Sequence, residues 1–199
     1  MIVISPAKRL SSKACDIILN ATTPAFNKEA NLLAKQLAKL DASDLTGLMG
    51  VSNTIADLNV ARFKSWGNSK EEEKRAIFQF EGDVFKHLDA RSLDNSDLIY
   101  MNQRLRILSG IYGLLRPSDK MNPYRLEMGT KYNFGDSENL YDFWGDKIAN
   151  QIKLETKGSI LFNLASEEYF SSIKKYTEPL KVIDFKFLSV SSGKERVIG

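Results

Sequence analysis

The sequence predicts an α/β protein in which helices surround a mixed sheet, folded as a single compact domain over residues 1–199. Short apolar runs with strand-like composition recur along the chain, and stretches with helical periodicity lie between them. A chain of 199 residues is long enough to bury a core of its own. No internal repeat and no low-complexity linker divides the sequence, so we expect one folding unit.

The first predicted strand is the apolar run Ile2–Ser5, which ends at Pro6 because proline cannot donate to a sheet. The residues that follow place a hydroxyl and two cations, Lys8 and Arg9, at the carboxyl end of that strand. Ligands of open α/β sheets bind at the carboxyl ends of strands. The Ser5–Lys8 loop is therefore a candidate site for the phosphate or carboxylate group of a small molecule.

A first helix is predicted from Asn27, its cap, to about Leu40. Its apolar stripe consists of leucines spaced by helical turns, namely Leu33, Leu37 and Leu40.

The stretch Ser43–Phe63 predicts two short helices joined by a tight turn, so residues 43–65 form a candidate helix-hairpin-helix element. Each helix carries an apolar pair, Leu45 with Leu48 and Ile55 with Leu58, with Ala61 and Phe63 beyond. Gly50 can take the positive φ of the turn, Val51 can pack inward, and Ser52 can cap the second helix. Backbone N–H groups at such a turn bind a phosphate without reading the bases. Ser52 stands where the motif has its second glycine, and a helical hairpin that only packs on the core is the alternative.

The remaining elements follow the same two periodicities. Helices are expected from a Ser69–Glu72 capping box through Phe80, from Asp94 or Ser96 to about Gln103, over Leu140–Leu154, and after Ser166. Strands are expected at Leu105–Leu108, Ser159–Leu164, Val182–Val190 and Arg196–Ile198.

A basic patch is predicted between Met101 and Lys131. The whole chain has a formal net charge of +3, whereas this stretch holds six cations against two carboxylates. A focused positive patch on a nearly neutral protein is typical of a polyanion-binding surface, and a solvated loop face is the alternative. Arg125 and Glu127 point to one side of an extended chain, which predicts either an ion pair or a binding or acid–base role.

Several function classes receive no support from the sequence. Cys15 and His87 are the only residues of their kinds and lie far apart, so we expect no disulfide, no metal site and no cofactor. No apolar run approaches about 20 residues, and the N-terminus lacks the apolar segment of a signal peptide. We therefore expect a cytoplasmic protein with no membrane partner.

Several stretches together resemble the peroxide stress resistance protein YaaA family. They are ISPAK (4–8), ARF (61–63) with Trp66, GDVF (82–85), LRILSGIYGLLRP (105–117), PYRLEMG (123–129), LYDFWGD (140–146), NLAS (163–166) and EYF (168–170). They cover most of the chain in the family's order, and the run from Leu105 to Gly129 is the most specific.

The resemblance implies a bacterial protein of the oxidative stress response with the family's own mixed α/β fold, called the cantaloupe fold. It also implies binding of double-stranded or damaged DNA through a basic cleft and a helix-hairpin-helix, and it establishes no reaction. Family members continue with a further basic segment, which we expect this chain to lack after Gly199. The candidate DNA-binding residues are Lys8, Gly50, Val51, Ser52, Arg62, Arg104, Arg106, Arg116, Tyr124 and Arg125. Aromatic side chains that could stack on an exposed base are Tyr112, Tyr124 and Trp144.

The main alternative is a DNA-repair enzyme of the glycosylase or lyase type. Lys8 would supply its amine nucleophile. A carboxylate would come from Glu127, Asp146 or Glu168.

Overall fold

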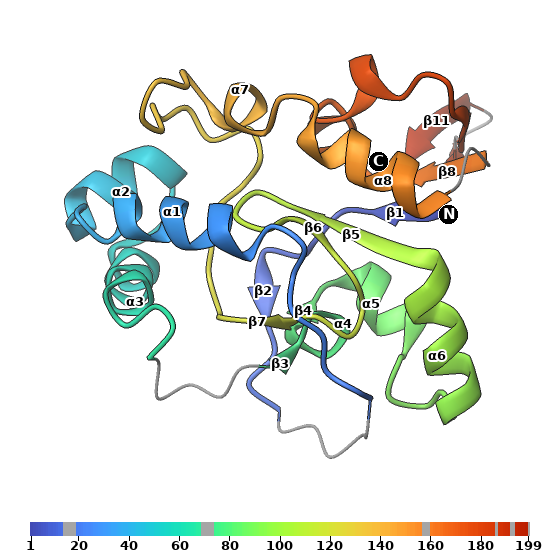
Figure 1. Ribbon diagram of the computed structural model, residues 1–199, viewed down its shortest axis with the longest axis horizontal. Coiled ribbons are helices and arrows are strands. Elements are labelled where there is room, and N and C mark those ends of the chain that lie inside the picture. Colours follow the sequence, from blue (N-terminus) through green and yellow to red (C-terminus); the bar gives the residue numbers. More distant parts are fainter. Residues whose placement is uncertain (14–18, 69–73, 157–159, 186, 192–193, 199) are drawn as a thin grey trace.

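A computed structural model describes residues 1–13, 19–68, 74–156, 160–185, 187–191 and 194–198 (Figure 1). Its main sheet has the strand order β6-β5-β1-β8-β9. Strand β1 pairs in parallel with both β5 and β8, β9 is parallel to β8, and β6 runs antiparallel to β5. The sheet is therefore mixed, as predicted, and the carboxyl ends of β1, β5 and β8 meet at one edge.

The strands of the main sheet are β1 (Ile2–Ile4), β5 (Leu105–Ser109), β6 (Gly113–Leu115), β8 (Ile160–Leu164) and β9 (Lys181–Asp184). Three small antiparallel pairs join β2 (Arg9–Leu10) to β4 (Phe80–Glu81), β3 (Lys74–Arg75) to β7 (Lys120–Met121), and β10 (Phe187–Ser191) to β11 (Lys194–Ile198). The helices are α1 (Asn27–Leu37), α2 (Ala42–Met49), α3 (Asn53–Lys64), α4 (Ala76–Gln79), α5 (Asp83–Leu88), α6 (Asn95–Arg104), α7 (Leu140–Trp144), α8 (Lys147–Thr156), α9 (Glu167–Phe170) and the 3-10 helix η1 (Lys174–Tyr176). Figure 1 shows α1, α2 and α3 gathered at one end of the molecule and α6 at the other.

The long motif at residues 105–117 is a core element, because all five residues of β5 and all three of β6 are buried. Close neighbours leave no room for a side chain at either of its two glycines. A Cβ at Gly110 would lie 2.5 Å from the carbonyl oxygen of Leu126, and a Cβ at Gly113 would lie 2.7 Å from the ring of Trp144. Gly113 also has a φ of +66°. The Trp144 indole N–H donates to the Gly110 carbonyl at 3.0 Å, so this turn holds α7 against the sheet.

Two predicted elements are divided in the structure. The helix expected over Leu140–Leu154 breaks at Gly145, which has a φ of +50° and separates α7 from α8. The strand expected over Val182–Val190 divides into β9, which belongs to the main sheet, and β10, which pairs with β11. The alternation of apolar and polar residues predicts a strand, but it does not show where the chain leaves one sheet and enters another.

A third predicted element falls partly outside the described residues. The Ser69–Glu72 capping box lies in the segment 69–73, which the structure does not describe. The part that follows is not one helix, because Lys74–Arg75 pairs as a strand and only residues 76–79 are helical. Asp94 rather than Ser96 is the cap of α6, and its side chain accepts from the Asp97 N–H.

The predicted pair of helices at residues 43–65 is present as α2 and α3. Gly50 ends α2 with a φ of +59°, and Ser52 is the N-cap residue of α3. The inward face of α3 differs from the prediction, because Leu58 and Ala61 are exposed whereas Ala56, Asn59 and Phe63 are buried. Because the buried face carries a polar Asn59 and the exposed face an apolar Leu58, hydrophobic spacing identified the helix and not its orientation.

Candidate functional site

The carboxyl ends of β1 and β8 are tied together by two serines. The Ser166 N–H donates to Ser5 Oγ at 2.9 Å, and Ser5 Oγ donates to Ser166 Oγ at 3.1 Å. These bonds fix the loop after β1 beside the start of α9. The loop lies where the strand order places β1 between β5 and β8, which is the position expected for a ligand site in an α/β sheet.

Three charged side chains meet at this edge. Lys8 Nζ lies 3.0 Å from one oxygen of Glu127, and a guanidinium nitrogen of Arg125 lies 3.1 Å from the other. Lys8 is 64% exposed, whereas Arg125 is 19% exposed and its Nε is buried without a hydrogen-bond acceptor among the described residues. The ion pair expected from the two-residue spacing of Arg125 and Glu127 is confirmed. Lys8 joins it from a distant part of the chain.

Glu168 lies at the same edge of the sheet and lines a hollow together with Lys8, Arg125 and Glu127. Its Oε1 accepts the Gly129 N–H at 2.9 Å, and its backbone carbonyl accepts the Tyr141 hydroxyl at 3.0 Å. Burial raises the pKa of the neighbouring Tyr169 hydroxyl, and the nearby charges of Glu168 and Glu127 raise it further. Tyr169 therefore stays a neutral phenol, able to donate a hydrogen bond, throughout the physiological range.

Around these residues the surface forms three adjoining hollows, which we call together the Lys8 groove. The inner hollow, about 210 Å³, is lined by Ser5, Pro6, Ala7, Lys8, Tyr124, Arg125, Leu126, Glu127, Ser166, Glu168 and Tyr169. The hairpin hollow, about 320 Å³, is lined by Leu48, Met49, Arg125, Glu127, Gly129, Thr130 and Glu168. The outer hollow, about 280 Å³, is lined by Pro6, Ala7, Lys8, Arg9, Glu81, Gly82, Asp83, Val84 and Phe85. Neighbouring hollows share lining residues and so adjoin one another.

The end of α2 lines this groove through Leu48 and Met49. At the turn beyond it, the Gly50 N–H donates to the Thr46 carbonyl at 3.0 Å and so is already used within the protein. The Ser52 side chain makes no capping bond to α3. Because an uncapped helix start presents its first N–H groups outward, the amides at the start of α3 are better placed to meet an anion than the Gly50 amide expected from the sequence.

A line of aromatic rings connects the hairpin to the groove. Ring centroids are 6.2 Å apart between Phe63 and Trp66, 5.7 Å between Trp66 and Tyr112, and 5.8 Å between Tyr112 and Tyr124. Tyr124 immediately precedes Arg125 in the chain. The position of α3 is thus coupled by direct packing to the residues that line the inner hollow.

The aromatic side chains expected to stack on a base are buried. Tyr112 is 1% exposed, Tyr124 is 5% exposed and Trp144 is fully buried. The Tyr124 hydroxyl bonds to Ser109 Oγ at 2.6 Å, and the Tyr112 hydroxyl accepts the Asn122 N–H at 2.8 Å. These residues build the core beneath the groove, so their stacking on DNA is not available in this structure.

The predicted basic patch of residues 101–131 does not form one surface. Arg106 is buried, and both it and Arg116 pair with Glu155 on α8. Burial lowers the pKa of the Met1 amine, and the charges of Arg104 and Arg106 lower it further. Arg104 is the last residue of α6 and Arg106 the second residue of β5, so both lie at the amino end of β5, whereas Lys8 follows the carboxyl end of β1.

The other predicted residues are dispersed. Arg62 is half-buried on α3, and Asp146 is exposed beside the start of α8. Neither lines any of the three hollows of the Lys8 groove. Of the catalytic candidates, Lys8, Glu127 and Glu168 converge on the inner hollow.

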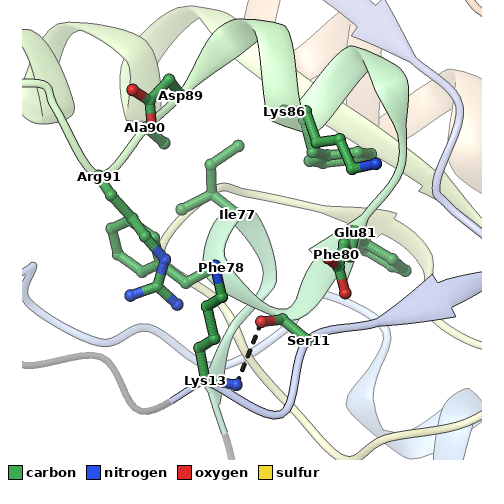
Figure 2. A pocket seen from close by; sticks show the side chains of 11 residues that line it. Ser11, Lys13, Ile77, Phe78, Phe80, Glu81, Lys86, Asp89, Ala90 and Arg91 are labelled. Carbon is green, nitrogen blue, oxygen red and sulfur yellow. Dashed lines mark hydrogen bonds between the residues drawn. The ribbon is translucent and has the colours of Figure 1, made fainter.

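One cavity was not anticipated from the sequence. Figure 2 shows it between β4, α5 and the loop after β2, with Lys13 and Arg91 at its mouth and Lys86 on the far side. It measures about 210 Å³. Lys86 and Arg91 lie five positions apart, but Lys13 comes from a distant part of the chain, so local sequence alone could not have identified the cavity.

Within the described residues, no helix is long and apolar enough to cross a membrane. The same part of the chain holds no cluster of three histidine, cysteine, aspartate or glutamate side chains arranged to bind a metal ion.

Comparison with known proteins gives consistent matches along the whole chain. The model of a family described as "Peroxide stress protein YaaA" matches residues 1–199. A UPF0246 protein of Caulobacter vibrioides is 42% identical over 202 residues, which cover 100% of this chain and 79% of the relative. One from Aliivibrio fischeri is 43% identical over 203 residues, covering 100% and 78%. One from Clostridium botulinum is 45% identical over 177 residues, covering 87% and 69%.

Proposed function

Because the chain belongs to the peroxide stress protein YaaA family, we propose that it is a DNA-binding protein of the peroxide stress response. In this proposal a duplex lies along the Lys8 groove. The α2–α3 hairpin acts as a helix-hairpin-helix element and contacts one phosphate through the first amides of α3. Binding is largely independent of sequence, because these groups meet the DNA backbone and not the base edges.

The observation that carries the proposal is that the hairpin and Lys8 border one groove. Leu48 and Met49 share the hairpin hollow with Arg125, and Arg125 shares the inner hollow with Lys8. Residues about 120 positions apart in sequence thus line one surface. A row of adjoining hollows suits an extended ligand better than pockets on separate faces would.

The charge of the groove limits how strongly it can attract DNA. Its described lining holds the cations Lys8, Arg9 and Arg125, together with four carboxylates, Glu81, Asp83, Glu127 and Glu168. If each cation meets one phosphate, the slope of log affinity against log salt is about −2.7 at most. That corresponds to about 40-fold weaker binding between 50 and 200 mM salt.

The test is a salt titration of a fluorescently labelled duplex, followed by anisotropy. Lys8→Gln and Arg125→Gln should each flatten the slope by about 0.9. Arg116→Gln is the matched control and should leave the slope unchanged, because Arg116 pairs with Glu155 away from the groove. A parent slope near zero would refute DNA binding. Displacement of the duplex by free nucleotides would favour a small phosphate or carboxylate ligand at the Ser5–Lys8 loop.

A specific contact also supports the second candidate, a lyase acting through Lys8. An amine must lose a proton before it attacks an aldehydic sugar carbon, and Glu127 Oε2, 3.0 Å from Lys8 Nζ, is placed to receive that proton. Lys8→Arg keeps the positive charge and removes the nucleophile. It should therefore preserve DNA binding while abolishing any adduct trapped by borohydride on abasic duplex. If the parent protein forms no adduct, the lyase candidate is excluded.

A further inference from the structure

The inner hollow is bordered by three segments that are joined to one another in a ring of contacts. Lys8 Nζ lies 3.0 Å from Glu127. Gly129, two positions further along that segment, donates its N–H to Glu168 Oε1 at 2.9 Å. The two serines that tie the loop after β1 to the start of α9 complete the ring. Lys8, Glu127 and Glu168 are thus held around one hollow by contacts on every side.

The two carboxylates of this hollow differ in what they bind. Both oxygens of Glu127 are occupied by cations, one by Lys8 at 3.0 Å and the other by Arg125 at 3.1 Å. The Glu168 side chain makes one bond within the described part of the chain, from Oε1 to the Gly129 N–H. That bond fixes the direction of the carboxylate and leaves Oε2 available to accept a proton.

The charge and size of the inner hollow suit an uncharged sugar. Two cations, Lys8 and Arg125, face two carboxylates, Glu127 and Glu168, so the lining has no net charge to attract a phosphate. Its volume of about 210 Å³ equals that of about seven waters at about 30 Å³ each. The aldehydic sugar left when DNA has lost a base is uncharged, and it carries the carbonyl carbon that an amine attacks.

We infer that Glu168 is the catalytic base of a second reaction step, in which a Schiff base on Lys8 leads to breakage of the DNA strand by β-elimination. The inference rests on the lyase candidate and adds a residue and a product to it. In the first step Lys8 Nζ condenses with the aldehyde carbon and releases water, and Glu127 accepts the lysine proton. Glu127 then remains between Arg125 and the lysine nitrogen, so a different carboxylate is needed for the second step.

The second step balances without an oxidant or a reductant. Glu168 Oε2 takes a proton from the sugar carbon next to the imine. The electron pair of that C–H bond forms a carbon–carbon double bond to the following carbon, whose bond to the phosphate oxygen breaks, so the downstream strand leaves with the phosphate. Water then hydrolyses the imine, which restores the Lys8 amine and leaves an unsaturated aldehyde on the upstream strand. A reaction that removes a base must supply this substrate, and one that hydrolyses the blocked end must consume the product.

The test follows a fluorescently labelled duplex with a single abasic site on a denaturing gel, with protein in excess, in the presence and absence of borohydride. Glu168→Gln keeps an acceptor for the Gly129 N–H and loses the base. It should form the trapped adduct at the parental rate and cleave the strand at least about 100-fold more slowly. Glu167→Gln is the matched control and should match the parent, because Glu167 is 72% exposed, pairs with Lys174 at 2.8 Å and lines none of the three hollows.

Two measurements show that each variant is folded and binds DNA. The thermal melting curves should be equal. The affinities should also be equal for a duplex whose abasic sugar has been reduced to the alcohol, because an alcohol cannot form an imine.

The outcomes separate the inference from the lyase candidate and from DNA binding. If Glu168→Gln cleaves at the parental rate, or if the parent forms an adduct without cleaving, the inference is wrong and Lys8 remains the nucleophile. If Glu168→Gln loses the adduct as well, Glu168 acts before the elimination, which also overturns the inference. If the parent forms no adduct, the lyase candidate and the inference both fail, while the salt slope of the parent decides DNA binding independently.

Discussion

Replacing Arg106 by glutamine distinguishes a structural role from the DNA contact that the sequence predicts. Its side chain is 6% exposed and pairs through Nε with Glu155, while NH1 donates to the backbone carbonyls of Asn102 and Leu105 at 2.8 and 2.6 Å. Glu155 is 13% exposed and also accepts from Arg116 and Gln151. No phosphate can reach a guanidinium enclosed in this way, so its effect should be on stability.

Removing one partner of a buried ion pair costs about 3–5 kcal/mol when the other charge is left uncompensated. Because Glu155 keeps Arg116 and Gln151 as partners, we expect a loss at the lower end of this range, about 3 kcal/mol. A domain of this kind has a total stability of about 5–15 kcal/mol. For a chain of 150–250 residues each kcal/mol lowers the melting temperature by about 2–4 °C, so a decrease of roughly 6–12 °C is expected.

Urea unfolding followed by circular dichroism measures this loss, and Arg104→Gln is the control because it removes an exposed arginine near the same end of β5. Burial by itself raises the pKa of the Glu155 carboxyl group. The hydrogen bond from Gln151, the charge of Arg106 and the hydrogen bonds from Arg106 and Arg116 lower it by more, so the net shift of the pKa is downward. A carboxyl group whose pKa is lower in the folded state stabilises the fold at any pH above its ordinary pKa of about 4.3. This stabilisation is lost as the pH falls through the pKa of the folded state. The stability gap between parent and Arg106→Gln should therefore narrow below about pH 4. A folded Arg106→Gln protein of unchanged stability, with a flatter DNA salt slope, would refute this reasoning.

Three further predictions concern the turns and a buried acid. Gly113→Ala should lower the free energy of unfolding, measured by urea titration, by about 2–5 kcal/mol. A positive φ costs an alanine about 1–2 kcal/mol, and overlap of its Cβ with the Trp144 ring costs about 1–3 kcal/mol more. A variant as stable as the parent would contradict this prediction. Gly50→Ala should cost only about 1–2 kcal/mol, because its Cβ meets no atom within 4 Å, and a larger loss would show that the turn is packed more closely than described. Burial raises the pKa of Asp119 despite a hydrogen bond from Thr22, so the folded state binds this proton more tightly. The parent should gain stability relative to Asp119→Asn as the pH falls from 7 toward about 3.9. If the difference in the free energy of unfolding between the two proteins stays constant over this range, the pKa of Asp119 is not raised.

Local sequence was sufficient for features whose cause lies within a few residues. The α2–α3 hairpin follows from one glycine that takes a positive φ at position 50, and β5 follows from a continuous apolar run. The ion pair of Arg125 with Glu127 follows from alternation along an extended chain. The loop after β1 was placed at a carboxyl end of the sheet by the same kind of argument, since one proline ends the strand.

The tertiary structure decided which charges belong together, because charges interact through space and not along the chain. Arg106 and Arg125 lie 19 positions apart in one basic stretch, yet one is buried against α8 and the other lines the Lys8 groove. Conversely, Lys13 and Arg91 share a cavity although 78 positions separate them. Strand order decides such groupings, since a strand that pairs on one side or the other of β1 carries its flanking residues to a different edge of the sheet. Hydrophobic periodicity indicates the type of an element, and it does not determine which other elements pack against it.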